Sequence, residues 1–163
     1  MKEPPLEIKT YPDPILRKEA QDVARVTDRE KRLLNHMVET MYANQGIGLA
    51  APQIGVAKRI SVMDAGDGLL KMINPVILKK KGASLLEEGC LSVPGRQVEI
   101  ERAEELSVSF LDEGGKRTTK SLKGLSARAV QHEIDHLNGK LIIDYLPWYK
   151  RVFSKRGEVL CLQ

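Results

Sequence analysis

Hydrophobic residues recur at helical spacing in the first third of the chain. Thr27 is followed three residues later by Glu30, the arrangement of a capping box at the start of a helix. The apolar positions that follow lie one, three or four residues apart: Leu33, Leu34, Met37, Val38 and Met41. This spacing predicts an amphipathic helix that begins after Thr27 and ends at Asn44-Gln45-Gly46. Upstream, residues 11–20 contain two prolines and predict a turn followed by a short helix.

Beyond Gly55 the pattern changes to short runs rich in β-branched and other apolar residues. These runs cover residues 59–64, 71–81, 97–104, 105–112 and 116–124. Each run predicts a strand, and Asp112-Glu113-Gly114-Gly115 predicts the turn of a hairpin. The connections between the runs are too short to hold crossover helices, so the sheets are expected to be antiparallel. Residues 46–55, GIGLAAPQIG, are rich in small residues and contain a proline, and they predict a loop.

A second helical pattern lies near residue 130. It predicts a helix from Ser126, as N-cap, to Asn138, with Gly139 as its stop. At about 100° per residue such a helix has three faces. The apolar face has Ala127, Val130, Ile134 and Leu137, the second has Ala129, His132, Glu133 and His136, and the polar third has Arg128, Gln131, Asp135 and Asn138. Because the two histidines are segregated from the polar face, we expect this helix near the centre of the domain.

These elements together predict an α+β fold. Antiparallel β-sheets would pack around a central metal-binding helix, with an N-terminal helical segment. Composition agrees with a single soluble domain over residues 1–163, because 42% of the residues are hydrophobic and 29% are charged, and no linker rich in Gly, Ser or Pro divides the chain. No apolar run could cross a membrane, and MKEPPLEIK lacks the features of a signal peptide, so a cytoplasmic protein is expected. The net charge of +4 permits an anionic partner without requiring one.

The strongest chemical signal is QHEIDHLNGK, residues 131–140. On a helix His132 and His136 lie on one face with Glu133 beside them, which is how the H-E-x-x-H pattern binds zinc with a glutamate as general base. A catalytic metal of this kind takes three protein ligands and keeps a position open for water. The motif therefore leaves one ligand to be found elsewhere in the chain.

Few residues can supply that third ligand. The remaining histidine, His36, falls on the polar side of the first predicted helix. A metzincin would need a histidine where Ile142 stands, and a thermolysin-like glutamate could only be Glu158 in the basic tail. Cys161 is third from the end and is best explained as a small apolar residue. Cys90, between a glycine and a Pro-Gly pair, is the favoured ligand, although a buried structural thiol would fit the same local pattern.

Three stretches taken together resemble the peptide deformylase family. That family carries G-x-G-x-A-A-x-Q, E-G-C-L-S and Q-H-E-x-D-H-L-x-G in this order. The chain has Gly46-Ile47-Gly48-Leu49-Ala50-Ala51-Pro52-Gln53, Glu88-Gly89-Cys90-Leu91-Ser92, and Gln131 through Gly139. The spacings and the early YPDPILRKEA are also similar, so the resemblance covers roughly residues 8–146 and leaves out the basic tail, residues 147–163.

The resemblance implies a bacterial or organellar enzyme of protein biosynthesis that removes the formyl group from the N-terminal formylmethionine of newly synthesised polypeptides. Cys90, His132 and His136 would bind one divalent metal ion, natively often iron(II), although zinc, nickel or cobalt can occupy such sites. Metal-bound hydroxide would attack the formyl carbon, with Glu133 as general base and then general acid.

Further roles carry over by position. The side-chain amide of Gln53 and the backbone N–H of Leu91 would stabilise the oxyanion, and the backbone at Gly48 would pair with the extended peptide. The methionine pocket would be lined by Ile47, Leu86, Leu125 and Ala129. Arg128 is charged where some relatives carry an aliphatic residue, and its place on the polar face predicts it at the rim of that pocket. Glu88 and Arg102 are predicted to pair and to fix the Cys90 loop, although both could equally be surface charges.

Two other functions stay open at the level of sequence. A metalloprotease or another amide hydrolase would use the same metal and glutamate. A ribosome-binding or RNA-binding module would need the metal to be structural, with a fourth protein ligand. The tail has four cations, Lys150, Arg151, Lys155 and Arg156, which suit ribosomal RNA or simply a solvated end. No membrane or DNA partner is expected.

Overall fold

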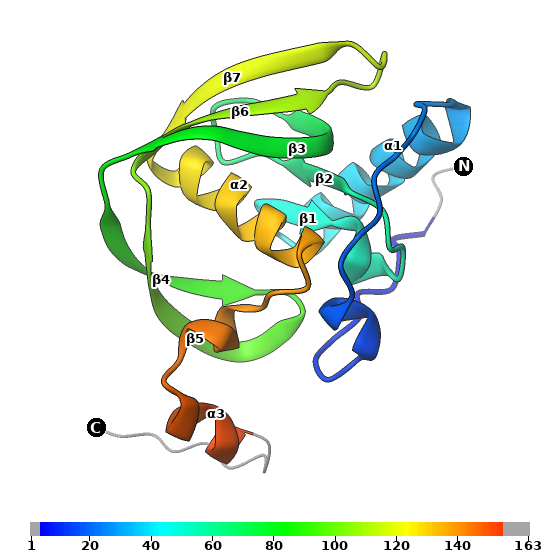
Figure 1. The fold of residues 1–163 in the computed structure, drawn as a ribbon. Coiled ribbons are helices and arrows are strands. Elements are labelled where there is room, and N and C mark those ends of the chain that lie inside the picture. The colour runs from blue at the N-terminus through cyan, green and yellow to red at the C-terminus, as the bar shows by residue number, and fades with distance from the viewer. Residues whose placement is uncertain (1–3, 155–163) are drawn as a thin grey trace.

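Two antiparallel sheets enclose a central helix in the computed structural model, which describes residues 4–154 (Figure 1). The larger sheet has the strand order β1 (Gly48–Ala50), β2 (Ile60–Met63), β3 (Leu70–Lys81), β6 (Glu105–Leu111) and β7 (Arg117–Lys123). The smaller sheet pairs β4 (Ser84–Cys90) with β5 (Val93–Arg102). Every pairing of named strands is antiparallel, which confirms the prediction from the short connections.

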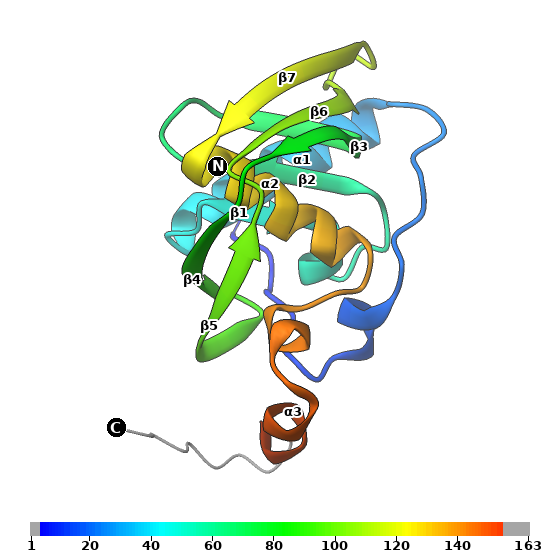
Figure 2. The ribbon, with the colours of Figure 1, turned by 60° about the vertical axis from the view of Figure 1, so that its left-hand side comes forward.

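The central helix is α2 (Gly124–Leu137), and it lies between the two sheets in both views (Figures 1 and 2). A second long helix, α1 (Asp28–Ala43), packs on the opposite face of the larger sheet. Strand β2 shows how this sheet has two buried faces. Ile60 and Val62 belong to the apolar cluster with α1, whereas Met63 belongs to the cluster with α2. The α+β fold with antiparallel sheets around a central helix and an N-terminal helical segment is therefore confirmed.

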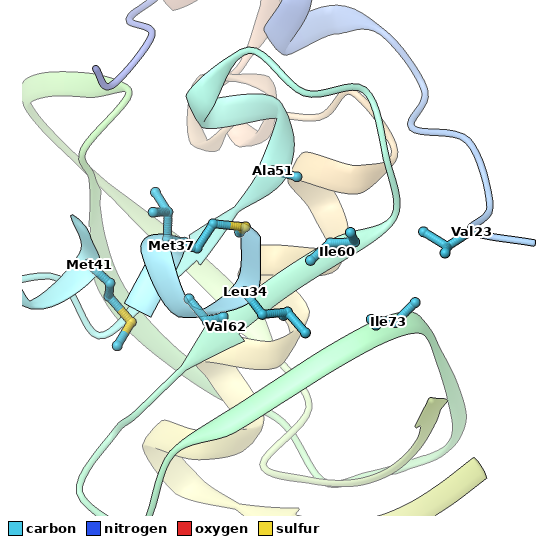
Figure 3. Close-up of a cluster of buried hydrophobic side chains, with 9 residues drawn as sticks. Val23, Leu34, Met37, Met41, Ala51, Ile60, Val62 and Ile73 are labelled. Atoms are coloured by element: carbon cyan, nitrogen blue, oxygen red, sulfur yellow. The ribbon is translucent and has the colours of Figure 1, made fainter. Parts of the chain in front are cut away.

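Helix α1 follows from local sequence. The backbone N–H of Arg29 donates to the Thr27 hydroxyl at 3.3 Å, and the backbone N–H of Thr27 donates to Glu30 at 3.1 Å, so the predicted capping box is confirmed. The helix ends before Asn44, as predicted. Its apolar side chains form one cluster with residues of the sheet, shown in Figure 3 by Leu34, Met37, Met41, Ala51, Ile60, Val62 and Ile73. Burial of such side chains contributes about 1.5–3 kcal/mol each, so this cluster accounts for much of the stability of the α1 half.

Helix α2 begins earlier than its sequence predicts. It starts at Gly124, and the N-cap is Lys123, whose side chain makes no capping hydrogen bond. Gly124 has φ +55°, which turns the chain directly from β7 into the helix without a capping side chain. Ser126, the predicted N-cap, lies in the first turn and its hydroxyl donates to Asp67 Oδ2 at 2.7 Å. The C-terminal stop at Gly139 is confirmed by its φ of +70°.

Two strands were not predicted. Strand β1 lies in the stretch expected to be a loop, and it pairs Gly48 with Met63 and Ala50 with Ser61. Its small residues were misleading because the strand is held mainly by backbone pairing. Leu49 and Ala50 are its only two buried side chains. Strand β4 has no alternating pattern, since Leu85 and Leu86 are both more than half exposed.

The two sheets are joined by one long two-stranded ribbon, residues 70–111. Lys81 pairs with Glu105 at the end of the β3–β6 pair, and Ser84 pairs with Arg102 at the start of the β4–β5 pair. The ribbon bends between these pairs and passes around α2 (Figure 2). Its closed end is the turn at Cys90, which pairs with Val93. The ribbon therefore carries Cys90 to the side of α2.

The remaining elements are short. Three 3₁₀ turns are η1 (Pro14–Arg17), η2 (Ala51–Ile54) and η3 (Ile142–Tyr145), and the last described helix is α3 (Trp148–Ser154). The short helix predicted near residues 11–20 is confirmed as η1, and the predicted hairpin turn is confirmed by the hydrogen bond from Gly115 N–H to Asp112 C=O at 2.9 Å. Across residues 4–154, no helix is long and apolar enough to cross a membrane.

Candidate metal centre

The turn at the end of β4 and the middle of α2 bring Cys90, His132 and His136 together. Cys90 Sγ lies 3.2 Å from His136 Nε2, which lies 3.1 Å from His132 Nε2. All three donor atoms lie within 4.8 Å of one another. The predicted third ligand is thus placed beside the predicted pair, while the other candidates, Glu158 and Cys161, lie outside the described residues.

Glu88 orients His132. Its Oε2 lies 3.0 Å from His132 Nδ1, so the ring carries its proton on Nδ1 and directs the lone pair of Nε2 toward the other two donors. The predicted pair of Glu88 with Arg102 is confirmed and is bidentate, at 2.7 Å from Nε and 2.9 Å from Nη2. Arg102 also donates to Asp135 Oδ2 at 2.7 Å. Burial would raise the pKa of Glu88, but hydrogen bonds from Arg102 and His132 hold it far below its usual range.

The polar face of α2 is buried at two of its four positions, Arg128 and Gln131. Arg128 is only 4% exposed, and it donates to Glu88 Oε1 at 2.8 Å and to the carbonyl of Ile100 at 2.9 Å. Gln131 is also 4% exposed and exchanges hydrogen bonds with the backbone of Ala103. Glu88, β5 and the backbone of Ala103 cover these two side chains and satisfy their polar groups. The prediction that Arg128 lies at the pocket rim was wrong, because Arg128 is part of the buried wall of the pocket.

The three donors fit a divalent metal ion. One sulfur and two imidazole nitrogens form a borderline-soft set of the kind that binds zinc, iron, nickel or cobalt. Burial would lower the pKa of His132, but contacts with Cys90, Glu88 and Glu133 raise it to about 10, so these surroundings favour a positive charge, which a metal ion at Nε2 would supply in place of a proton. Burial and the neighbouring His132 lower the pKa of His136, which leaves its lone pair available for a metal.

Glu133 lies beside the three donors and is 3% exposed. Its Oε2 is buried and has no hydrogen-bond partner among the described residues. Burial raises the pKa of Glu133 to about 7, although the neighbouring His132 and Arg102 act in the opposite direction. Gly48 on β1 makes room for this carboxylate, because a Cβ at Gly48 would stand 2.2 Å from Glu133 Oε1. A carboxyl group with a pKa near neutrality can both accept and release a proton.

Gln53, on η2, is held with its amide group toward the cluster. Its Oε1 accepts the backbone N–H of Ala50 at 2.8 Å, and its Nε2 donates to Ser92 Oγ at 3.1 Å and toward Cys90 Sγ at 3.7 Å. Ser92 is fully buried and was not singled out from the sequence, although it closes the E-G-C-L-S motif. These contacts fix which end of the amide faces the cavity.

A cavity of about 770 Å³ opens in front of the cluster. The predicted residues on its wall are Ile47, Gly48, Gln53, Cys90, Leu91, Leu125, Ala129, His132 and Glu133. Leu86 is not among the lining residues, and its side chain is 54% exposed on β4. Arg128, Arg96 and Gln97 also line the cavity, so its wall is less apolar than the sequence indicates.

This fold, with an H-E-x-x-H helix between antiparallel sheets and a sulfur donor brought to it by a strand, is that of a metal-dependent hydrolase. A sequence profile described as "polypeptide deformylase" matches residues 5–152. The chain belongs to this family.

Individual relatives that are similar to this chain are also peptide deformylases. The peptide deformylase of Halothermothrix orenii is 50% identical over 143 residues, which cover 86% of this chain and 93% of the relative. That of Alkalilimnicola ehrlichii is 51% identical over 155 residues, covering 93% and 87%. Among solved structures, the Thermotoga maritima peptide deformylase has a TM-score of 0.86 at 43% identity, covering 89% of this chain and 99% of that one. The Ehrlichia chaffeensis peptide deformylase in complex with actinonin has a TM-score of 0.90 at 39% identity, covering 96% and 100%.

The protein is therefore an enzyme. Its family removes the formyl group from nascent peptides in a reaction that depends on a divalent metal ion. The two other functions that the sequence left open, a metalloprotease and an RNA-binding module with a structural metal, are not the ones that the family supports.

Proposed function

We propose that Cys90, His132 and His136 hold the metal ion of this deformylase and that Glu133 carries the protons of the reaction. The observation that supports this most strongly is the convergence of three donor atoms within 4.8 Å beside the buried Glu133, whose Oε2 has no hydrogen-bond partner in the described part of the chain. A divalent ion at this position supplies Lewis acidity, which makes a water molecule acidic near neutral pH and polarises the formyl oxygen.

Glu133 accepts a proton from the attacking water and passes it to the amine nitrogen that leaves. Its raised pKa, about 7, suits both halves of this transfer, since the group is then neither a strong acid nor a strong base at neutral pH. The absence of a partner for Oε2 within residues 4–154 leaves that oxygen available for the exchange. Gly48 keeps the carboxylate against β1 because no side chain separates them.

Gln53 and Leu91 stabilise the negative charge that develops on the formyl oxygen. The Nε2 of Gln53 is directed toward Cys90 Sγ, and Leu91 follows Cys90 directly, so its backbone N–H starts from the same turn. The amide orientation is fixed by Ala50 and Ser92, and no reorganisation is then required during the reaction.

The peptide lies along β1, with its backbone against Gly48. Strand β1 pairs only with β2 among the described strands, so its other edge is free for strand addition. The first side chain of the peptide enters the cavity wall made by Ile47, Leu125 and Ala129. Leu86, more than half exposed, contacts the peptide from β4 instead of lining the floor.

Iron(II) is the native metal in this proposal. The donor set alone accepts zinc, nickel and cobalt as well. The similarity to the family supports iron(II), and the metal content of protein purified without oxygen tests the assignment. Zinc in protein that was never exposed to air would contradict it.

Formate release tests the proposed function directly. Protein is stripped with a chelator without oxygen, loaded separately with each of the four metals, and incubated with a formyl-Met tripeptide. An acetyl-Met tripeptide of the same sequence is the matched control. We expect formate from the first peptide only, and no cleavage of internal bonds in either. Internal cleavage with the formyl group retained would instead support a metalloprotease.

Three broader features complete the proposal. Residues 1–163 act as one catalytic domain in the bacterial cytoplasm or in an organelle, where formylated chains are made. The basic tail, residues 147–163, attaches the enzyme to ribosomal RNA. Lys150 is exposed on α3, and Trp148 is 75% exposed beside it, while Lys155 and Arg156 lie outside the described residues.

The tail is tested by deletion of residues 150–163. Ribosome co-sedimentation should fall, and its salt dependence should weaken, because fewer phosphates are neutralised. Turnover of the free tripeptide should survive. Unchanged sedimentation would rule out the tail as the attachment, and lost tripeptide turnover would show that the tail is needed for the fold.

A further inference from the structure

Tyr145, on η3, makes hydrogen bonds at the polar face of α2, which is not the face that carries His132, Glu133 and His136. Its hydroxyl donates to Asp135 Oδ2 at 2.7 Å and accepts from Arg102 Nη1 at 3.1 Å. Asp135 follows Glu133 by two residues, so on a helix it points to a different face. The mechanism proposed above gives Tyr145 no role.

A continuous series of contacts connects this hydroxyl to a metal-ligand candidate. Arg102 Nη1 donates to Asp135 at 2.7 Å, and the other edge of the same guanidinium holds Glu88 at 2.7 and 2.9 Å. Glu88 Oε2 in turn lies 3.0 Å from His132 Nδ1. Tyr145 is therefore three side chains from His132 through Asp135, Arg102 and Glu88, and two through Arg102 and Glu88.

The geometry of Arg102 makes this connection sensitive to Tyr145. The guanidinium is planar and 5% exposed, so any rotation that changes its contacts with Asp135 also changes its contacts with Glu88. Tyr145 restrains it twice, by the hydroxyl and by the ring, whose centroid lies 5.0 Å from Arg102 Cζ.

The outer end of the series is open to solvent. A cavity of about 410 Å³ is lined by Arg102, Asp135 and Tyr145 among others, and the α2 residues that line it are different from those that line the substrate cavity. The Asp135 side chain is 19% exposed there. If the hydroxyl is removed, water can take its place at Asp135, but water does not restrain the carboxylate as a tethered ring does.

We propose that Tyr145 is a positioning residue of the deformylase, and that its hydroxyl fixes the orientation of His132 through Arg102 and Glu88. The inference rests on the proposed function in one respect, that His132 is a metal ligand. Residues that hold a ligand in place affect metal affinity and turnover by about 10–100-fold, and Tyr145, two contacts further away than Glu88, should affect them by about 3–10-fold.

Tyr145→Phe tests the proposal with little risk to folding, because the ring still packs on the cluster that contains Leu141 and Ile142. Tyr11→Phe is a matched control. Tyr11 packs against the same cluster and has the Arg17 guanidinium 5.5 Å from its ring, but in residues 4–154 its hydroxyl makes no hydrogen bond. Each variant loses one hydroxyl from an otherwise similar setting.

Four quantities are compared in the two variants and the wild type: the zinc dissociation constant of the apoprotein, the visible spectrum of the cobalt form, kcat with KM, and the thermal midpoint. For Tyr145→Phe we expect zinc binding about fivefold weaker, a shifted cobalt spectrum, kcat about fivefold lower and KM within about twofold. Tyr11→Phe should match the wild type in all four.

Several results would overturn the proposal. One is zinc affinity and kcat in Tyr145→Phe that equal those of Tyr11→Phe. Another is a lower thermal midpoint with an unchanged cobalt spectrum, since the hydroxyl would then only brace the fold. Failure of the proposed function is distinguishable, because wild-type protein would bind zinc at Cys90, His132 and His136 without releasing formate.

A double-mutant cycle checks the route. In a Glu88→Gln background, Tyr145→Phe should weaken zinc binding by less than about 1.5-fold, because Glu88 transmits the effect. The same fivefold loss in both backgrounds would show that Tyr145 acts by another route. Circular dichroism confirms that Glu88→Gln is folded before the cycle is interpreted, and the comparison with Tyr11→Phe does not depend on it.

Discussion

Two glutamates, one at the start of α1 and one in the middle of α2, expose similarly little surface but have opposite acidities. Glu30 is 4% exposed and Glu133 is 3% exposed. Hydrogen bonds from Lys58, at 2.7 Å, and from Thr27 lower the pKa of Glu30 to about 2, although burial acts in the other direction. Burial raises the pKa of Glu133 to about 7, and its Oε2 has no partner in the described part of the chain.

A small exposed area therefore does not by itself decide what a carboxylate can do. Both side chains expose little surface, but Glu133 lies deeper in the protein, and Glu30 has hydrogen-bond donors beside it that stabilise its charged form. Glu30 is held by a helix cap and an ion pair, so it stays ionised and does not exchange protons near neutral pH. Glu133 Oε2 has no hydrogen-bond partner in residues 4–154, and a buried carboxyl group of this kind can transfer protons near neutral pH.

Glu88 shows that both kinds occur within one site. It is 7% exposed and is held by Arg102, Arg128 and His132. In its acidity it resembles the distant Glu30 and not its neighbour Glu133, since these contacts lower its pKa. In the proposed mechanism, Glu88 would therefore support the metal centre and Glu133 would carry its protons.

The largest expected effect is that of Glu133→Gln. Turnover should fall by about 10³-fold, because the proton carrier is lost while the shape of the side chain is kept. Metal content should be unchanged, since Glu133 is not one of the three converging donors. Formate release and elemental analysis of the same preparation measure both. Loss of the metal would show that Glu133 coordinates it.

Arg128→Met should cost about 3 kcal/mol of stability, which corresponds to about a 10²-fold change in the folding equilibrium. The change removes one of the two guanidiniums from Glu88 and leaves the carbonyls of Ile100 and Ser84 without their donor. Denaturant unfolding measures it. The exposed Arg32→Met makes the same chemical change on α1 and should cost less than about 0.5 kcal/mol. Equal stability of the two variants would show that Glu88 does not need Arg128.

Gly48→Ala should lower kcat by about 10²-fold with the metal retained. The new Cβ would stand 2.2 Å from Glu133 Oε1, so the carboxylate has to move by an ångström or so, and displacements of that size have such effects. In the Glu133→Gln background the same substitution should add little, because both changes act on one carboxyl group. If the two losses of kcat multiply in the double variant, Gly48 acts on peptide binding and not through Glu133.

The smallest expected effect concerns Glu30 and depends on pH. The folded-state pKa, about 2, lies below the ordinary value of 4.5, so the carboxylate stabilises the fold above pH 4.5 and this contribution is lost as the pH falls toward 2. Glu30→Gln should therefore cost about 2 kcal/mol at pH 7, with allowance for the partial exposure of Lys58, and progressively less below pH 4.5.

Denaturant unfolding at pH 7 and pH 3.5 measures this difference. The exposed Glu39→Gln on α1 is the control and should change stability by less than about 0.5 kcal/mol at either pH. A cost for Glu30→Gln that stays constant between the two pH values would contradict the assigned acidity.

The comparison also shows which features a sequence reveals. Thr27 and Glu30 are three residues apart, so their contact is part of a local motif and was predicted with its helix. His132, Glu133 and His136 are likewise local, and similarity of motifs added Cys90. Strand β1 was missed because backbone pairing leaves no side-chain pattern in three small residues.

Long-range polar pairs were mostly beyond prediction. Arg102 meets Asp135 and Tyr145, which are 33 and 43 residues away, and nothing near any of the three indicates the others. The partners of Arg128 and Gln131 on the polar face of α2 were missed for the same reason, since they come from β4, from β5 and from Ala103 just after β5. Only the Glu88–Arg102 pair was anticipated, from the position of both residues beside the ligand loop.

The two-stranded ribbon of residues 70–111 has a consequence for the order of folding. Its closed end at Cys90 is its shortest loop, so pairing can spread outward from there through the bend to β3 and β6 without closing a longer one. His132 and His136 lie beside Cys90 only after α2 has packed. The set of three donor atoms is therefore expected to form late in folding. We therefore expect the metal to capture a chain that is already folded and to slow its unfolding, with the refolding rate the same in the presence and absence of zinc. Stopped-flow refolding measures this, and acceleration by zinc would show that the ion instead acts as a nucleus.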